Sequence, residues 1–140
     1  MSGTTSIDVT VRYAETDQMG LAYHANYLVW CDIARTEYLR ERGLSYRTME
    51  ADGLLLAVVE AEVRYRASAR YDDRLRIACW VRDVSSRRVE FGYAMEHAPS
   101  GRPVATARTA LMALDATYAI TRIPVEIRAA LEPIPDPVRL

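Results

Sequence analysis

The chain of 140 residues is long enough to enclose one sizeable core and too short for two. Its net charge of −1 gives no overall attraction to nucleic acid or to an acidic membrane. All 18 basic residues are arginines, which excludes a Schiff-base lysine and the lysine of a phosphate-binding P-loop. The first residues lack the pattern of a secretion signal, and the longest apolar run, 54–59, is too short to span a bilayer. We therefore expect a cytoplasmic protein without a membrane span.

Apolar and polar residues alternate in five stretches, which is typical of antiparallel strands with one polar face. These predicted strands are residues 7–13, 57–66, 74–82, 89–96 and 104–114. Short polar segments at 84–87 and 99–102 predict hairpin loops between the last three strands.

A helix is predicted between the first two strands, from about residue 24 to 42, where Gly43 ends it. Its first half, 27–31, is apolar nearly all round and is expected to be buried on most sides. Helical turns are predicted at 46–51 and 125–131, and the proline-rich tail, about 133–140, is expected to be extended. The simplest architecture is a single α+β domain, 1–140, in which a curved antiparallel sheet of five or more strands wraps around one long central helix.

The loop before this helix carries the chemistry-bearing residues. A helix start offers free N–H groups and a partial positive charge. A carboxylate there, Asp17, is placed to attack a carbonyl or activate water while those N–H groups hold an oxyanion. The alternative is that Asp17 is only a helix cap. His24 either orients substrate or water, or makes local hydrogen bonds, and Gly20 either lets a substrate approach the backbone or only supports the turn.

These segments together resemble the hotdog fold, and more narrowly the 4-hydroxybenzoyl-CoA thioesterase family and its acyl-CoA thioesterase relatives associated with the Tol-Pal system. Two departures are Asp32, where many relatives carry a glutamate, and Ser68, where a proline is common. The matching residues are Arg12-Tyr13, Glu15-Thr16-Asp17, Met19-Gly20, Tyr23-His24, Asn26-Tyr27, Trp30, Ala34-Arg35, Val63-Arg64-Tyr65, Ala69-Arg70-Tyr71-Asp72-Asp73 and Arg122-Ile123-Pro124.

The resemblance implies an acyl-CoA thioesterase that releases an acid and free coenzyme A. Asp17 would be its catalytic carboxylate, as nucleophile or as general base, with backbone N–H groups near Tyr23 and His24 as the oxyanion hole. Tyr13 would border the acyl site, although an inward-facing tyrosine at the end of a strand is more simply a packing residue. Family members pair their sheets edge to edge, so we expect a homodimer or homotetramer with acyl-CoA as substrate and no cofactor.

The remaining candidates are weaker. Coenzyme A carries phosphates, and the candidates to bind them are arginines at strand ends and in loops: Arg64, Arg66, Arg70, Arg87, Arg88 and Arg122. For most of them a solvated strand face is the simpler account, and we expect Arg87, Arg88 and Arg122 to bind the phosphates. Gly20 and Tyr23 are expected to contact the substrate as well. Trp80, with Ala78, interrupts the arginine-rich strand face and is a candidate interface anchor. The two cysteines, Cys31 and Cys79, match no metal or redox spacing and are expected to be buried thiols without a metal.

Two other functions stay open. One is a non-catalytic subunit that binds acyl thioesters. The other, ranked lower, is a hydroxyacyl-thioester dehydratase that would pair His24 with Asp32, although an ion pair with Arg35 is the simpler role for Asp32. A nucleic-acid-binding module is least favoured because acids balance the arginines. The acyl group itself does not follow from the sequence.

Overall fold

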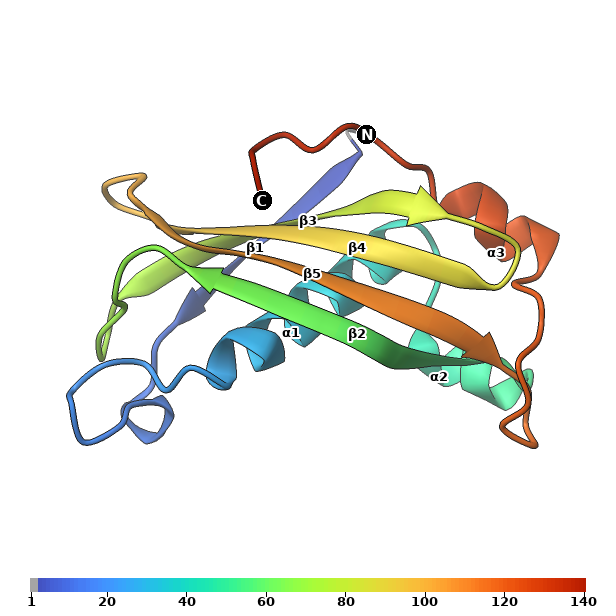
Figure 1. Cartoon of the computed structure of the whole chain (residues 1–140), viewed down its shortest axis with the longest axis horizontal. Helices are drawn as coiled ribbons and strands as arrows, with labels where there is room; N and C mark the ends of the chain where they lie inside the picture. The colour runs from blue at the N-terminus through green and yellow to red at the C-terminus, as the bar shows by residue number, and fades with distance from the viewer. Residues whose placement is uncertain (1–2) are drawn as a thin grey trace.

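A computed structural model describes residues 3–140, in which one long helix lies along one face of a curved five-stranded sheet (Figure 1). All neighbouring strands are antiparallel, in the order β1-β3-β4-β5-β2. The strands are β1 Thr4–Thr10, β2 Leu55–Tyr65, β3 Arg74–Val84, β4 Arg88–His97 and β5 Pro103–Leu114. The helices are α1 Asn26–Glu41, α2 Tyr46–Ala51 and α3 Val125–Ala130, with a 3-10 turn, η1, at Tyr13–Glu15. The predicted α+β architecture is confirmed.

The core lies between α1 and the concave face of the sheet. Trp30 and Tyr38 of α1 are buried there together with alternate residues of the strands, among them Ile77 and Phe91. Both cysteines are also buried, as expected. Burial raises the pKa of the Cys31 thiol to about 12, so this side chain stays a neutral packing group.

The strands depart from simple alternation at several places, two of which bear on the predictions. A β-bulge between Val58 and Glu60 shifts the register of β2 against β5, because one extra residue is inserted into the strand. The first strand ends at Thr10 rather than continuing to residue 13. The expectation that Tyr13 is an inward-facing strand residue is therefore wrong: it lies in η1 and is 78% exposed.

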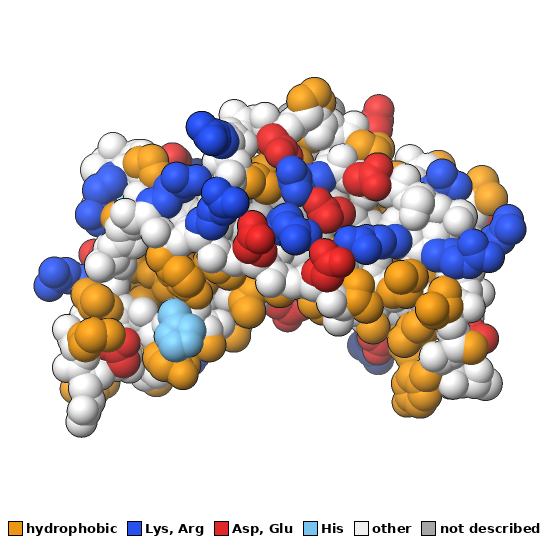
Figure 2. Space-filling view, viewed as in Figure 1, with side chains coloured by type: hydrophobic (Ala, Val, Ile, Leu, Met, Phe, Trp, Pro, Cys, Tyr) orange, Lys and Arg blue, Asp and Glu red, His pale blue; other side chains and the backbone are white. Residues whose placement is uncertain are grey.

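The convex face of the sheet carries a network of ion pairs, visible as interleaved basic and acidic side chains across the centre of Figure 2. Arg82 pairs with Glu90 at 2.6 Å, and both Arg88 and Arg108 reach Glu60 at 3.3 and 3.2 Å. Such partly exposed pairs contribute little individually. They do neutralise each arginine locally, so most of this face is not a free anion-binding surface.

The C-terminal tail lies across one end of the convex face. Trp80 is fully buried, its ring lies over Gly92, and its indole N–H donates to Asp136 Oδ1 at 2.9 Å. The same carboxylate accepts from Arg82 at 3.0 Å. The prediction that Trp80 anchors an interface with another chain is therefore wrong, because the protein's own tail covers it.

The outward face of α1 has no such cover. Leu28, Val29 and Ile33 are 39–49% exposed, since the sheet packs against only the opposite side of the helix. Leu28 and Val29 belong to the first half of this helix, 27–31, so the expectation that this half is buried on most sides is wrong for the described chain. None of the helices in this described part is long and apolar enough to cross a membrane.

Candidate active site

Asp17 lies in a tight turn between η1 and α1. Its Oδ1 accepts hydrogen bonds from the backbone N–H groups of Met19, at 2.9 Å, and Leu21, at 3.4 Å. Gly20 completes the turn with a φ of +79°, a conformation that strongly favours glycine. Among residues 3–140, Oδ2 of Asp17 has no hydrogen-bond partner. One carboxylate oxygen therefore holds the turn, and the other is available to a ligand.

The turn is held against α1 by Glu15, a buried carboxylate. Its side chain accepts from the indole N–H of Trp30 at 3.0 Å and from the N–H of Arg12 at 2.8 Å. Desolvation alone would raise the pKa of Glu15, but these hydrogen bonds and the Arg12 charge outweigh it and leave the pKa below its usual value. Glu15 thus stays ionised and fixes the Asp17 turn to the helix.

The backbone before α1 decides which N–H groups are free. The Tyr23 N–H donates to the Glu15 carbonyl at 2.8 Å, so it is not available as an oxyanion donor. In the described chain, the N–H groups of His24 and Ala25 donate to no other group. Free N–H groups at a helix start attract negative charge. The candidate oxyanion donors are therefore the N–H groups of His24 and Ala25, rather than those of Tyr23 and His24 as predicted.

A cavity of about 330 Å³ opens beside this turn. Its volume falls within the usual range for small-molecule sites. Tyr65 of β2 closes one side, where its hydroxyl donates to the His24 carbonyl at 2.9 Å. Burial raises the pKa of Tyr27, which also lines the cavity, so its phenol stays protonated. The lining residues are Asp17, Met19, Leu21, Ala22, His24, Tyr27, Tyr65, Arg66, Ala67 and Ser68.

The predicted site residues are only partly brought together. Asp17 and His24 line the cavity, Gly20 shapes the turn, and the Tyr23 ring packs against His24 at a tilt of 45°, with ring centroids 4.5 Å apart. Tyr13 does not line it and instead packs edge-on against Tyr71 at 5.7 Å. A catalytic role for Tyr13 stays a prediction.

The three predicted phosphate-binding arginines lie at the other end of the sheet. The Asp17 turn follows β1 beside the start of β3, whereas Arg87 lies in the hairpin after β3 (Figure 1). Arg122 follows β5 near the same hairpin, as the bond from the Ile123 N–H to the Ser86 carbonyl shows. Arg88 is paired with Glu60 at 3.3 Å. The chain by itself does not bring these arginines to Asp17, and their role stays a prediction.

Three residues at the site, Glu15, Tyr65 and Arg66, were not selected as site residues from the sequence, although Glu15 and Tyr65 belong to the matched motifs and Arg66 was among the candidate phosphate-binding arginines. Glu15 was recognisable only as part of the matched motif, and its three-residue spacing from Arg12 was the available signal for their 3.3 Å ion pair. Tyr65 is the last residue of β2 and Arg66 follows it, and no local pattern in the sequence connects either of them with residue 17. The predicted Asp32–Arg35 ion pair is confirmed at 2.8 Å. Among the described residues, no group of three His, Cys, Asp or Glu side chains is arranged to hold a metal ion.

Comparison with known proteins defines the family. The model of the thioesterase-like superfamily matches residues 11–131. YneP of Bacillus subtilis, provisionally assigned as an acyl-CoA thioesterase, is 40% identical over 86 residues, which are 61% of this chain and 62% of YneP. The matched region thus spans less than two thirds of that relative.

Two solved structures cover more of the chain. A Thermus thermophilus protein of unassigned function has a TM-score of 0.85 and 34% identity, covering 91% of this chain and 95% of its own. The DHNA-CoA thioesterase of Staphylococcus aureus has a TM-score of 0.82 and 32% identity, covering 85% and 80%. The fold is the hotdog fold. The chain belongs to the thioesterase-like superfamily.

Proposed function

We propose that this protein is an acyl-CoA thioesterase that hydrolyses a thioester to a carboxylic acid and free coenzyme A. The observation that carries the proposal is the free oxygen of the Asp17 carboxylate in a cavity beside the unengaged N–H groups of His24 and Ala25. The names of YneP and of the Staphylococcus enzyme support the same activity. A cytoplasmic location stays a prediction.

The chemistry needs little more than these groups. A thioester carbonyl is electrophilic, and a thiolate leaves without strong acid assistance. Asp17 either removes a proton from the attacking water or attacks the carbonyl itself to form an anhydride, which water then hydrolyses. In both routes the negative charge that develops on the carbonyl oxygen is held by the N–H groups of His24 and Ala25. Collapse of the tetrahedral intermediate expels the coenzyme A thiolate, which takes up a proton.

We further propose that the active form is at least a homodimer. Strand β2 is a free edge, and its Val58 and Val59 are about half exposed. The exposed apolar face of α1, Leu28, Val29 and Ile33, is also uncovered. A long free edge and an exposed apolar helix face favour self-association. Analytical ultracentrifugation tests this, and a monomer at micromolar concentration would contradict it.

Such a dimer would give the distant arginines a role. A two-fold axis through paired β2 strands places the two copies in opposite directions, so the far end of one sheet lies beside the Asp17 end of the other. Arg87 and Arg122 are exposed and make no ion pair in residues 3–140. From that far end they could bind the phosphates of a coenzyme A whose thioester lies at the partner's Asp17.

The experiment measures thiol release from a panel of aromatic, short-chain and long-chain acyl-CoA esters. Turnover of one class by the wild-type protein identifies the acyl group. If every ester binds but none is hydrolysed, the enzyme proposal fails and the protein is a non-catalytic acyl-thioester-binding subunit.

A further inference from the structure

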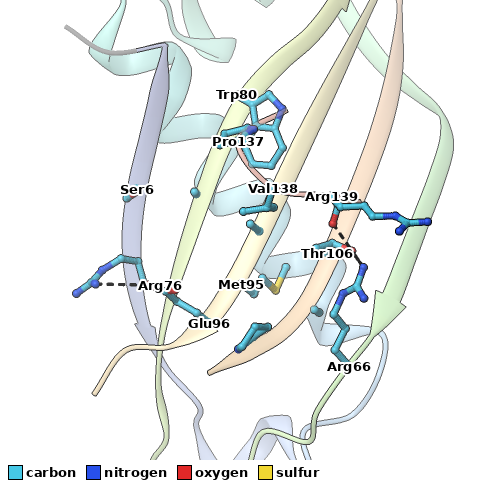
Figure 3. A pocket seen from close by; sticks show the side chains of 14 residues that line it. Ser6, Arg66, Arg76, Trp80, Met95, Glu96, Thr106, Pro137, Val138 and Arg139 are labelled. Carbon is cyan, nitrogen blue, oxygen red and sulfur yellow. Dashed lines mark hydrogen bonds and ion pairs between the residues drawn. The ribbon is translucent and has the colours of Figure 1, made fainter. Parts of the chain in front are cut away.

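A second cavity, of about 410 Å³, lies on the convex face of the sheet, under the C-terminal tail (Figure 3). Its floor is a row of four small side chains across four strands. Ser6 of β1 is opposite Ala78 of β3, Ala78 is opposite Ala94 of β4, and Ala94 is opposite Thr106 of β5. Larger side chains in this row would fill the space, so the cavity follows directly from the sequence of the strands.

The charges around the cavity are unbalanced. Of its four charged side chains, Arg76 and Glu96 pair with each other at 3.6 Å. The other two, Arg66 and Arg139, make no ion pair among residues 3–140. Arg66 contacts only neutral oxygens, the Thr106 hydroxyl and the Arg139 carbonyl, each at 3.5 Å (Figure 3). The arginines at the centre of this face, Arg82, Arg88 and Arg108, are all paired with acids, whereas this cavity has two arginines without an acidic partner in the described chain and is therefore suited to an anion.

The rest of the lining is apolar and offers no aromatic ring to stack on. Pro137 and Val138 of the tail form one wall. Trp80 is fully buried, with its ring on Gly92 and its N–H taken by Asp136. A nucleobase would find no free ring face here, whereas an aliphatic chain needs only apolar surface.

We propose that this cavity is a second ligand site, for an aliphatic carboxylate of the fatty-acid type. The chain lies along the row of small side chains, and the carboxylate binds Arg66 and Arg139. Arg66 also lines the Asp17 cavity, so the two sites share a side chain. Fatty acids are products of the proposed reaction with aliphatic substrates. That link rests on the proposed function, but binding at this site does not.

The test is titration of the wild-type protein with decanoate below its micelle concentration, followed by calorimetry and by NMR of the indole N–H groups. The chain has two tryptophans. Trp80 lines the second cavity, whereas Trp30 lies beneath the Asp17 turn. We expect the Trp80 resonance to move and the Trp30 resonance to stay. Movement of Trp30 alone would mean binding at the Asp17 cavity and would overturn the proposal.

Matched variants separate the chain from the head group. Ala94→Leu fills the floor and is expected to weaken binding at least about 10-fold, because it removes the space for the chain. Arg139→Gln, at an exposed tail residue, is expected to weaken it about 3- to 10-fold, and decanol to bind more weakly than decanoate by a similar factor. Arg128→Gln, on α3, is the control, and we expect it to leave decanoate binding unchanged.

Two outcomes would overturn the proposal. One is equal affinity of all variants for decanoate, and the other is displacement of decanoate by coenzyme A but not by other fatty acids. Thiol release, measured separately, tests the catalytic function.

Discussion

Two loops at opposite ends of the sheet are built in the same way around an aspartate. Oδ1 of Asp17 accepts from the N–H groups two and four residues further on, at 2.9 and 3.4 Å, and Oδ1 of Asp115 does the same at 2.8 and 3.1 Å. The fourth residue of each turn has a positive φ, +79° at Gly20 and +67° at Tyr118. Locally, the two carboxylates have the same structural role.

Their surroundings differ. Asp17 lines a cavity beside unengaged helix-start N–H groups, and the buried Glu15 fixes its turn to the core. Asp115 lines neither of the cavities described above and accepts a further bond from the Thr117 hydroxyl at 2.6 Å. This bond and two backbone N–H groups lower the pKa of Asp115 and complete its role within the turn. A turn aspartate thus becomes a candidate catalyst through what the fold places next to it.

The largest effect is expected from lengthening each aspartate by one methylene, which keeps the charge but moves the carboxylate. Asp17→Glu displaces the carboxylate by about 1 Å or more, and we expect kcat to fall about 10²-fold because attack geometry is sensitive on this scale. Asp115→Glu should leave kcat unchanged. Steady-state kinetics of both variants measure this. A similar fall for both would mean that the loops affect activity only through stability.

The next largest effect is expected from removing the charge of Glu15, which holds the Asp17 loop and has no counterpart at the Asp115 loop. Glu15→Gln is expected to lower the free energy of unfolding by about 1–3 kcal/mol, because hydrogen bonds to a charged, buried acceptor are weakened. Chemical denaturation at pH 7 measures the change. Glu126→Gln, on exposed α3, is the control and should change it little.

The pH dependence gives Glu15 a second test. Its pKa in the folded state lies below the usual value near 4.5, so its contribution is fully present above that pH and is lost as the pH falls through the folded-state pKa. The difference in stability between wild type and Glu15→Gln should therefore shrink below about pH 4.5. A constant difference down to pH 3 would show that the carboxylate charge is not what holds the turn.

The smallest effect comes from the residue with positive φ. Tyr118→Gly should raise the free energy of unfolding by up to about 1 kcal/mol, because glycine adopts this conformation without strain. Gly20→Ala should lower it by about 1 kcal/mol. Thermal melts of the two variants would show shifts of opposite sign, and shifts of equal sign would contradict the equivalence of the two turns.

Most of the fold could be predicted from the sequence because strand alternation and helix periodicity are local signals. The hairpins after Val84 and after His97 fall where polar loop residues predict them. Contacts between distant segments could not be predicted in this way. The strand pattern predicts that Trp80 is exposed. It is buried because the C-terminal tail, including Asp136 56 positions later, packs over it.

The same division holds for the site. Asp17 and His24 are close in sequence and were found together, whereas Tyr65 reaches His24 from 41 positions away. The Tyr23 N–H donates to the Glu15 carbonyl because the turn folds back on itself, and the pattern of side chains does not predict this backbone conformation. The apolar face of α1 was predicted to be buried but is exposed in the single chain, and in the proposed homodimer a second copy would cover it.

The most direct test compares Asp17→Asn with Asp115→Asn in thiol release from the preferred acyl-CoA, with fold and oligomeric state checked for both. Asparagine keeps the oxygen that holds each turn and removes only the charge. The account predicts that kcat falls about 10²- to 10⁴-fold for Asp17→Asn and is unchanged for Asp115→Asn. Full activity of a folded Asp17→Asn protein would contradict a catalytic role for this carboxylate.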